Sequence, residues 1–221
     1  MKPPTEIQIL QSWEENARRW NSLIEEDKLE SRTLITNKAI LHAIRNQRIQ
    51  KVIDVGCGEG WLVRSLNRLG MQATGIDGST SLVQLAKAKG GNFQHLSYQQ
   101  LISGKQISGA PFELAVFNFS IFDKDGTDNL LNAIKQLLVK GGRIIIQSLH
   151  PEAVSKNSSG SWQKDVWQGL PGDFTQPYSW YLRSFNEWNQ LFQNCHLQLL
   201  STKEYSHPHT HKPLSVIFEL A

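Results

Sequence analysis

Apolar residues recur along this chain in two patterns, first with the spacing of helices and then in short runs that alternate with helices. In residues 7–24 apolar side chains return every three or four positions, which predicts an amphipathic helix, and a second helical stretch spans about 34–44. Between residues 51 and 149, short apolar runs alternate with helical patterns. This alternation predicts an α/β protein with a doubly wound parallel sheet. The predicted strands are 51–55, 72–76, 93–96, 112–117 and 143–149, and the predicted helices between them are 58–69, a stretch capped by Ser79 and ended by Gly90-Gly91, and 128–139.

The alternation stops after His150, and residues 152–183 show neither the helical nor the strand period. A connection of this length inside a compact domain is typically a functional lid or a disordered segment, and its many aromatic residues favour a lid. Helical periodicity returns after a capping box at Ser184, and two further strands are predicted at 196–202 and 214–220. Residues 1–221 are therefore expected to form one domain, with N-terminal helices in 1–48 and an insertion at 152–183.

Composition narrows the classes of protein without selecting one. The 221 residues suffice for one α/β domain with a full core, and the net charge of +3 comes from scattered basic residues. Extended nucleic-acid binders usually carry a basic patch or run, so no nucleic-acid partner is expected. No signal-like segment and no apolar run of membrane-spanning length is evident, so no membrane partner is expected either. Two cysteines far apart, Cys57 and Cys195, give no disulfide framework and fit a cytoplasmic protein.

The most informative segment is residues 52–60, a short apolar strand that ends in a glycine-rich turn and leads into a helix. The next apolar segment ends in an acid, Asp77. A βαβ unit of this kind holds an adenosine-containing cofactor, because the glycines let the ligand approach the backbone and the acid binds the ribose hydroxyls. The alternative for Asp77 is a simple cap of the following helix.

The spacing of the glycines distinguishes between cofactors. A dinucleotide-binding turn carries three glycines as G-x-G-x-x-G around a pyrophosphate. Here Gly56, Gly58 and Gly60 alternate, and Trp61 occupies the place of the third glycine in that pattern. Asp54 lies two residues before the turn, where a carboxylate suits a cationic amino group better than a pyrophosphate. A nicotinamide- or flavin-binding turn stays the alternative, although the chain lacks a Tyr-x-x-x-Lys pair.

Residues 52–60 resemble motif I of the class I S-adenosylmethionine-dependent methyltransferases, Asp77 resembles their motif II, and residues 112–122 resemble their motif IV. Residues 140–143 are similar to the turn that leads into their fifth strand. The resemblance covers roughly residues 50–150 by motifs and the remainder by layout. It implies a Rossmann-like sheet of seven strands, mostly parallel with an antiparallel last strand, and helices on both faces. It also implies S-adenosyl-L-methionine (SAM) as cofactor and S-adenosyl-L-homocysteine (SAH) as product.

The resemblance also assigns residues to each part of the cofactor. The glycine turn would border the methionine part, Asp77 the ribose, and the next two residues the ribose and adenine. Many relatives carry an acid after the third strand for the adenine amino group, where this chain has Ser97 followed by Tyr98. A serine or backbone groups can accept that hydrogen bond instead. The residues implied as cofactor-binding are Asp54, Gly56, Cys57, Gly58, Asp77, Gly78, Ser79, Ser97, Tyr98, Asn118 and Phe119.

Methyl transfer requires chiefly that acceptor, methyl group and sulfur be aligned, because the cofactor itself brings the activation. Where the acceptor must lose a proton, His150 is the candidate general base. It follows the carboxyl end of the predicted fifth strand, where the ligands of such sheets gather, and histidine titrates near neutral pH. The alternative is a structural histidine that hydrogen-bonds the turn before Pro151.

An acceptor pocket is expected where the aromatic segment and the N-terminal helices flank the cofactor. Trp162, Trp180 and Tyr181 suit a flat or apolar small molecule. Arg32 is a candidate to hold a carboxylate of the acceptor or the cofactor, with a plain surface arginine as the alternative.

Three alternating histidines, His207, His209 and His211, suggest a metal site near the C-terminus. No acidic partner accompanies them in sequence, and prolines mark a surface loop there. Metal-dependent relatives carry an aspartate after the fourth strand, where this chain has Asn118. No metal is therefore expected.

The sequence thus favours a methyltransferase that acts on a small-molecule acceptor through an oxygen, nitrogen or carbon nucleophile, as a monomer or homodimer. Alternatives are a non-catalytic SAM-binding protein, a nicotinamide-dependent oxidoreductase and an RNA methyltransferase. The last has little support, because the segment that begins at Asn118 lacks the prolines common in amino-methylating nucleic-acid enzymes.

Overall fold

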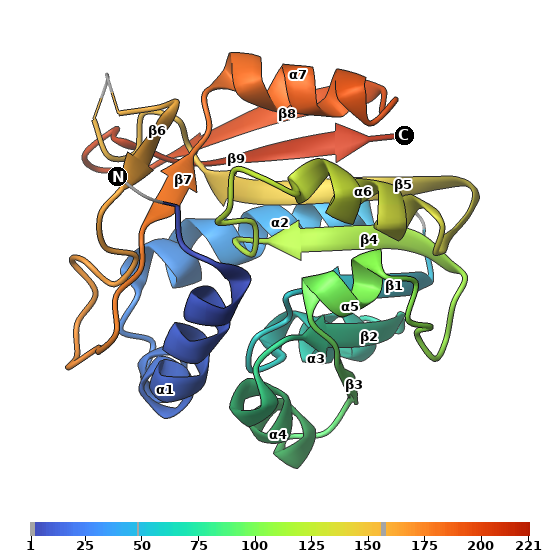
Figure 1. The fold of residues 1–221 in the computed structure, drawn as a ribbon, viewed down its shortest axis with the longest axis horizontal. Helices are drawn as coiled ribbons and strands as arrows, with labels where there is room; N and C mark the ends of the chain where they lie inside the picture. The colour runs from blue at the N-terminus through green and yellow to red at the C-terminus, as the bar shows by residue number, and fades with distance from the viewer. Residues whose placement is uncertain (1–2, 48, 156–157) are drawn as a thin grey trace.

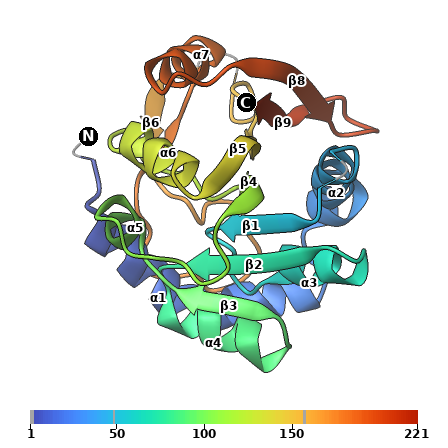
Figure 2. The ribbon, with the colours of Figure 1, turned by 90° about the vertical axis from the view of Figure 1, so that its right-hand side faces the viewer.

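A seven-stranded sheet runs through the protein, and helices cover both of its faces (Figures 1 and 2). The computed structural model describes residues 3–47, 49–155 and 158–221. Residues 1–2, 48 and 156–157 lie outside this description, and with them small parts of the predicted N-terminal helices and of the predicted insertion. In sheet order the strands are β3 (Asn92–His95), β2 (Gln72–Asp77), β1 (Lys51–Val55), β4 (Phe112–Asn118), β5 (Leu138–Leu149), β9 (Pro213–Leu220) and β8 (Leu199–Ser206).

The strands from β3 to β5 pair in parallel, and β9 lies antiparallel to both β5 and β8. The predicted mostly parallel sheet with an antiparallel last strand is confirmed. The chain order reverses between β1 and β4, so the connections that leave these two strands pass to opposite faces of the sheet. Such a switch point opens a crevice at the carboxyl ends of the two strands, where ligands bind in folds of this class.

The helices form two layers, which Figure 2 shows on either side of the sheet. Side chains of α2, α3 and α4 pack on one face, and those of α5, α6 and α7 pack on the other. Side chains alternate along β1, so Ile53 and Val55 lie in the core beneath α5, α6 and α7, and Val52 lies in the core beneath α2, α3 and α4. The helices are α1 (Glu6–Glu25), the π-helix η1 (Arg32–Thr36), α2 (Asn37–Arg45), α3 (Trp61–Arg68), α4 (Thr80–Ala88), α5 (Tyr98–Ile102), α6 (Thr127–Lys135) and α7 (Phe185–Asn194).

Large aromatic side chains fill the core beneath α7. Trp188 and Phe192 from α7 and Phe218 from β9 are almost fully buried, with ring centroids 5.2 to 5.7 Å apart. Burying such a side chain stabilises the fold by ~1.5–3 kcal/mol. The predicted capping box places this helix, since Ser184 Oγ accepts from Glu187 N and the Glu187 carboxylate accepts from Ser184 N. The ring contacts with Phe218 hold α7 against β9.

The structure differs from the predicted elements in several places. The helix expected from residue 58 begins at Trp61, and the strand expected at 196–202 runs from Leu199 to Ser206. The helix expected to reach residue 139 ends at Lys135, and β5 already begins at Leu138, because Leu138 pairs with Phe112 before a register shift. The short helix α5 was not predicted. The segment 152–183 contains two strands, β6 (Ser161–Gln163) and β7 (Trp180–Leu182), which pair only with each other and are too short to show a period. Among the described residues, no helix combines the length and apolar composition needed to span a membrane.

Candidate active site

A cavity of about 440 Å³ lies at the carboxyl edge of the sheet. Figure 1 shows α1 and the β6–β7 hairpin at this edge, to which the arrow of β4 points. Residues from α1, η1, the turn after β1, the loop after β4 and the segment 166–170 line the cavity. The site is therefore assembled from parts of the chain that are far apart in sequence.

The glycine turn after β1 forms the floor of the cavity. Gly56, Gly58 and Gly60 have φ values of +76°, +56° and +82°, which side-chain-bearing residues rarely adopt. The amides of Gly56 and Cys57 donate to Ile76 O at 2.8 and 2.9 Å. A Cβ on Gly56 would lie 2.5 Å from Ser120 Cβ, so the turn also packs closely against the loop after β4. The glycines are thus required by the backbone itself.

Asp77, at the end of β2, holds this turn and also faces the cavity. Its Oδ2 accepts from Gly58 N at 2.8 Å, and its Oδ1 accepts from Ser79 N at 2.8 Å. Burial raises the pKa of the carboxyl, while the two amide bonds oppose that rise. Asp77 therefore does more than cap α4, because it also ties β2 to the glycine turn.

Asp54, one residue before the end of β1, is a buried acid in the cavity wall. Its side chain is 2% exposed, and Oδ1 has no hydrogen-bond partner among the described residues. Burial, and then the charges of Asp77 and Glu59, raise the pKa of Asp54 to about 8. An unpartnered buried acid is costly in the fold, so a cationic partner would be bound strongly here.

Arg32, from η1, provides the opposite charge in the same cavity. Its guanidinium carbon lies 5.7 Å from the ring centre of Trp20 and 5.2 Å from that of Trp61. Burial lowers the pKa of Arg32 to about 10, so the side chain stays charged near neutral pH. Nη2 is buried and has no partner among the described residues. One cavity therefore holds an unpartnered carboxyl oxygen and an unpartnered guanidinium nitrogen.

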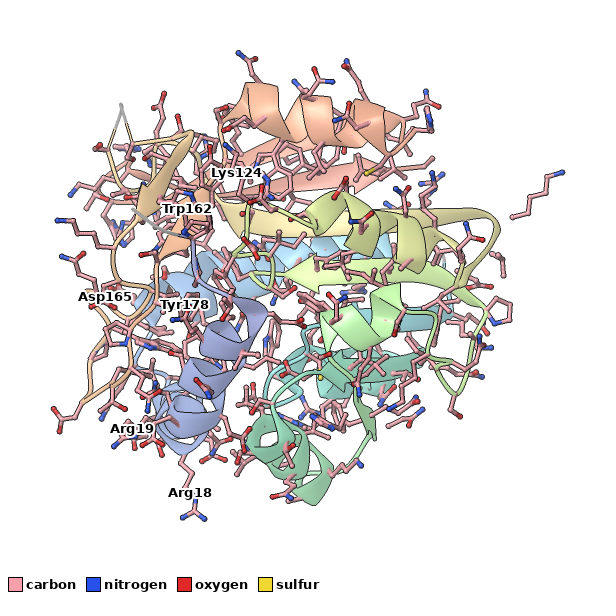
Figure 3. All side chains as sticks on the ribbon, in the orientation of Figure 1. Arg18, Arg19, Lys124, Trp162, Asp165 and Tyr178 are labelled. Carbon is pink, nitrogen blue, oxygen red and sulfur yellow. The ribbon has the colours of Figure 1, made fainter. Side chains whose placement is uncertain are left out.

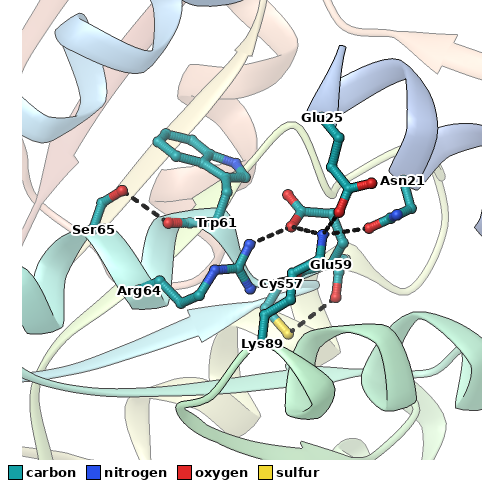
Figure 4. Close-up of polar contacts among 9 residues, drawn as sticks. Asn21, Glu25, Cys57, Glu59, Trp61, Arg64, Ser65 and Lys89 are labelled. Carbon is teal, nitrogen blue, oxygen red and sulfur yellow. Dashed lines mark hydrogen bonds and ion pairs between the residues drawn. The ribbon is translucent and has the colours of Figure 1, made fainter. Parts of the chain in front are cut away.

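Glu59 joins the glycine turn to the helices around it (Figure 4). Its Oε2 lies 2.6 Å from Arg64 Nη2 and 3.8 Å from Lys89 Nζ. Lys89 also contacts Glu25 and Asn21 of α1, at 2.8 and 2.5 Å. These contacts hold α1 against α4 and above the cavity.

The structure brings most of the predicted cofactor residues together, but two of them serve as helix caps. Ser79 Oγ accepts from Leu82 N at 3.2 Å at the start of α4, and Ser97 Oγ accepts from Gln100 N at 3.2 Å at the start of α5. Neither lines the cavity. The predicted cofactor residues that do line it are Asp54, Gly56, Cys57, Gly58, Asp77, Gly78, Tyr98, Asn118 and Phe119.

Tyr98 and Cys57 stand in the wall of the cavity as buried, uncharged groups. Tyr98 Oη donates to Ser120 O at 3.0 Å, and burial raises the pKa of this phenol. Burial also raises the pKa of the Cys57 thiol well above its usual value. A thiol that resists ionisation is a poor nucleophile, so Cys57 is suited to packing in the wall of the cavity.

His150 is placed away from the cavity. It is 4% exposed, its Nε2 lies 2.8 Å from Glu204 Oε2, and its Nδ1 accepts from Glu152 N at 3.0 Å. The ring also packs edge-on against Phe185, with 5.4 Å between centroids. These contacts fit the structural alternative, because both ring nitrogens are already used, and His150 is not carried into the proposed mechanism.

The predicted substrate aromatics also lie outside the cavity. Trp162 packs on Tyr181 at 5.3 Å across the β6–β7 hairpin, and Tyr181 Oη donates to Glu187 Oε1 at 2.6 Å. Trp180 is buried beside them and does not line the cavity. Figure 3 shows Trp162 on the hairpin and Tyr178 nearer α1. Of the predicted substrate-binding residues, Arg32 alone lines the cavity.

Other aromatic residues enclose the cavity in their place. Trp13 and Trp20 from α1, Phe122 from the loop after β4, and Trp167 line it. Ring centroids of Trp13 lie 5.4 Å from Trp20, 5.9 Å from Phe122 and 4.7 Å from Trp167. The helical spacing of Trp13 and Trp20 did place them on one face in the sequence, but nothing local indicated that this face covers a cavity.

Polar contacts join α1 to the 165–178 segment, so the two form one cover over the cavity. The amide of Asn16 donates to Thr175 O at 2.7 Å, and Thr175 N donates back to Asn16 Oδ1 at 2.9 Å. Trp167 Nε1 donates to Ser12 Oγ at 3.0 Å. In contrast, Arg18 on the same helix is exposed, and Figure 3 shows it projecting away from the cover.

The three alternating histidines form a turn. His207 Nδ1 accepts from His209 N and Thr210 N, both at 3.3 Å. Within the described part of the chain, no group of three or more His, Cys, Asp or Glu side chains is arranged to hold a metal.

Comparisons with known proteins agree with this geometry. A family model described as a methyltransferase domain matches residues 13–207. The demethylmenaquinone methyltransferase of Tropheryma whipplei (strain Twist) is 26% identical over 103 residues, which cover 46% of this chain and 43% of that protein. O-methyltransferase 12 of Dictyostelium discoideum is 24% identical over 199 residues, 87% of this chain and 52% of that protein. The chain thus spans about half the length of the curated relatives it matches, or less.

A solved structure with a similar fold is the magnesium protoporphyrin IX methyltransferase of Synechocystis PCC 6803 with bound SAH. It superposes with a TM-score of 0.69 at 14% identity, over 97% of this chain and 98% of that protein. At this identity the similarity establishes the fold.

Proposed function

The chain belongs to the methyltransferase-domain family, with the fold of SAM-dependent enzymes, and we propose that it transfers a methyl group from SAM to a small-molecule acceptor. The observation that carries the proposal is the acid and the guanidinium that line one cavity, each with a buried atom that lacks a partner among the described residues, Asp54 Oδ1 and Arg32 Nη2. The methionine part of SAM is a zwitterion, with one ammonium and one carboxylate. An acid and a guanidinium beside the glycine turn suit those two groups.

The remaining residues of the turn fit the rest of the cofactor. Asp77 lies at the end of β2 with both oxygens on backbone amides, and the lone pairs not used there are available to ribose hydroxyls. Asn118 Oδ1 is buried without a partner among the described residues and is available to a donor in the cavity. A Cβ on Gly78 would lie 2.5 Å from a methyl group of Leu10, so α1 covers this end closely.

When bound, the cofactor supplies an activated methyl group on a sulfonium sulfur, so the protein need only position and enclose the reactants. Asp54 and Arg32 would hold the methionine part of the cofactor, and Asp77 would hold its ribose. The cover made by α1 and Trp167 would keep water away from the reacting groups. The aromatic side chains of the cover would hold a flat or apolar acceptor.

We further propose that residues 1–221 act as one methyltransferase domain in the cytoplasm, as a monomer or homodimer. The contacts between α1 and the 165–178 segment support the assignment of both as a cover of the acceptor site. The free thiols of Cys57 and Cys195, both buried, support a reducing compartment.

The test is production of SAH when the purified protein is incubated with SAM and a pool of small apolar acceptors. Formation of SAH that depends on an acceptor and is lost in Asp77→Ala would support the proposal. Binding of SAM without any turnover would indicate the non-catalytic alternative, and reduction of NAD by the same pool would indicate an oxidoreductase.

A further inference from the structure

The loop between β4 and α6 places one carboxylate, Asp123, at the aromatic end of the cavity. Phe122, directly before it, packs on Trp13, and Trp13 packs on Trp167. All four residues line the cavity. The basic side chain of the same loop is turned elsewhere, because Lys124 Nζ lies 4.8 Å above a tyrosine ring on β7.

Arg183 fixes this loop through its main-chain carbonyl groups, and its positive charge partly opposes the rise that burial causes in the pKa of Asp123. Arg183 is 4% exposed, and its Nη2 donates to Asp123 O, Lys124 O and Thr127 Oγ1 at 2.5, 2.9 and 2.7 Å. Asp123 Oδ1 accepts from Lys124 N at 2.7 Å. Within the described residues Asp123 takes part in no ion pair. The carboxylate is therefore held in place and keeps its capacity to bind a ligand.

Two acids of this loop, Asp123 and Asp125, line the cavity, whereas its neighbours Lys124 and Arg183 do not. Among the described lining residues Arg32 is the one basic side chain, and it lies against Trp61 beside the glycine turn. Asp125, in the same loop, is exposed and also lines the cavity. Aromatic faces and a carboxylate together attract a cation, through the ring quadrupoles and the negative charge.

We infer that the acceptor is a basic amine carried on a flat apolar body, and that Asp123 binds its ammonium group and takes its proton. The inference rests on the proposed methyl transfer and specifies its acceptor. The apolar body lies between Trp13, Phe122 and Trp167, and the charged nitrogen lies at Asp123. Burial raises the pKa of Asp123 above its ordinary value, and the charge of Asp125 adds to the rise. The amide bonds from Lys124 and Asp125 and the charge of Arg183 oppose it without cancelling it.

The reaction balances without a further reactant. The ammonium gives one proton to the Asp123 carboxylate, which frees the nitrogen lone pair. That lone pair forms the new bond to the methyl carbon as the bond from carbon to sulfur breaks, and the electron pair of that bond stays on sulfur. The products are the methylated ammonium, the neutral thioether and one proton, which leaves Asp123 for solvent.

The test compares three ligands of one shape on the SAH-bound protein, where no transfer takes place. Tryptamine, tryptophol and indole-3-acetate present a cation, a neutral hydroxyl and an anion on the same ring, and saturation-transfer NMR titrations give their dissociation constants. We expect tryptamine to bind about tenfold more tightly than tryptophol, and the acetate more weakly still. Asp123→Asn, which keeps the shape, is expected to abolish the difference, and Asp125→Asn is expected to retain it.

Three results would overturn the inference: equal binding or no binding of the three ligands, a preference for tryptamine that survives in Asp123→Asn, or an equal loss in Asp125→Asn. The last would assign the effect to the overall charge of the loop. Calorimetric titration of the same preparations with SAH separates this inference from the proposed function. If the protein binds SAH but does not prefer tryptamine to tryptophol, the inference alone is refuted. If the protein does not bind SAH, the proposed function is refuted.

Discussion

Replacement of Asp54 by asparagine is expected to weaken SAM binding and to stabilise the free protein. The substitution keeps the shape of the side chain and removes its charge. An ammonium about 4 Å from the carboxylate gains ~4 kcal/mol at an effective dielectric constant of about 20. At pH 7 a carboxyl group with a pKa of about 8 must first lose its proton, which costs ~1.4 kcal/mol. The net loss in Asp54→Asn is therefore ~2–3 kcal/mol, or roughly 30- to 150-fold weaker binding.

The same substitution affects stability in the opposite direction. The folded-state pKa of Asp54 lies at about 8, above the ordinary value of 3.8, so the folded protein holds a proton that the unfolded chain has lost between these values. The free energy of unfolding consequently falls by ~1.4 kcal/mol per pH unit through this window, and the loss is complete above the folded-state pKa. Asparagine has no proton to lose. The ligand-free variant is therefore expected to melt at a higher temperature than the natural protein at pH 8 to 9.

Calorimetric titration with SAM at pH 6 and pH 7, each in two buffers of different ionisation enthalpy, measures both affinity and proton release. The natural protein is expected to release close to one proton per bound SAM and to bind up to tenfold more tightly at pH 7, since Asp54 must ionise. The variant should release fewer protons and show little pH dependence. Unchanged affinity, equal proton release, or a lower melting temperature at pH 9 in Asp54→Asn would refute the reasoning.

Substitutions at three further residues test other parts of the site. Arg32→Met should weaken SAM binding about tenfold or more in calorimetry, and Arg32→Lys should restore part of it, because a guanidinium bond to a carboxylate is worth ~1.5–3 kcal/mol. Equal affinity in all three proteins would remove Arg32 from the site. His150→Gln should leave SAM affinity within about twofold but lower the melting temperature by ~2–8 °C, since it disturbs a part-buried hydrogen bond worth ~1–2 kcal/mol. A large loss of SAM affinity with an unchanged melting temperature would instead support a role for His150 in the site. Gly56→Ala should lower both stability and SAM affinity, because its Cβ would lie 2.5 Å from Ser120 Cβ at a φ of +76°. A variant as stable as the natural protein would contradict that geometry.

The sheet and the glycine turn could be predicted from the sequence because their signals are local. Buried parallel strands appear as continuous apolar runs, and each predicted run from 51 to 117 lies in a strand with bounds within a residue or so. The turn at Gly56 to Gly60 needs left-handed backbone at each glycine, which restricts those positions to one residue type. The fold class was confirmed on these grounds.

The aromatic side of the cavity could not be predicted, because tertiary packing decides which aromatic residues face it. Trp162 and Trp167 lie in the same irregular segment, yet Trp167 faces the cavity and Trp162 packs on the hairpin. Which one does so depends on the bond from Trp167 to Ser12, in a helix 155 residues away along the chain. Ser97 shows a local signal with two interpretations. Its capping box with Gln100 accounts for its place at the start of α5, and the contact with the adenine stays a prediction.

Calorimetric titration of the purified protein with SAM, SAH and NAD tests the central claim most directly, with Asp77→Ala as the variant that removes the proposed contact to the ribose. The account predicts that the two sulfur ligands bind, that both bind more weakly to the variant, and that NAD does not compete with them. Binding of NAD alone, or of none of the three ligands, would contradict it.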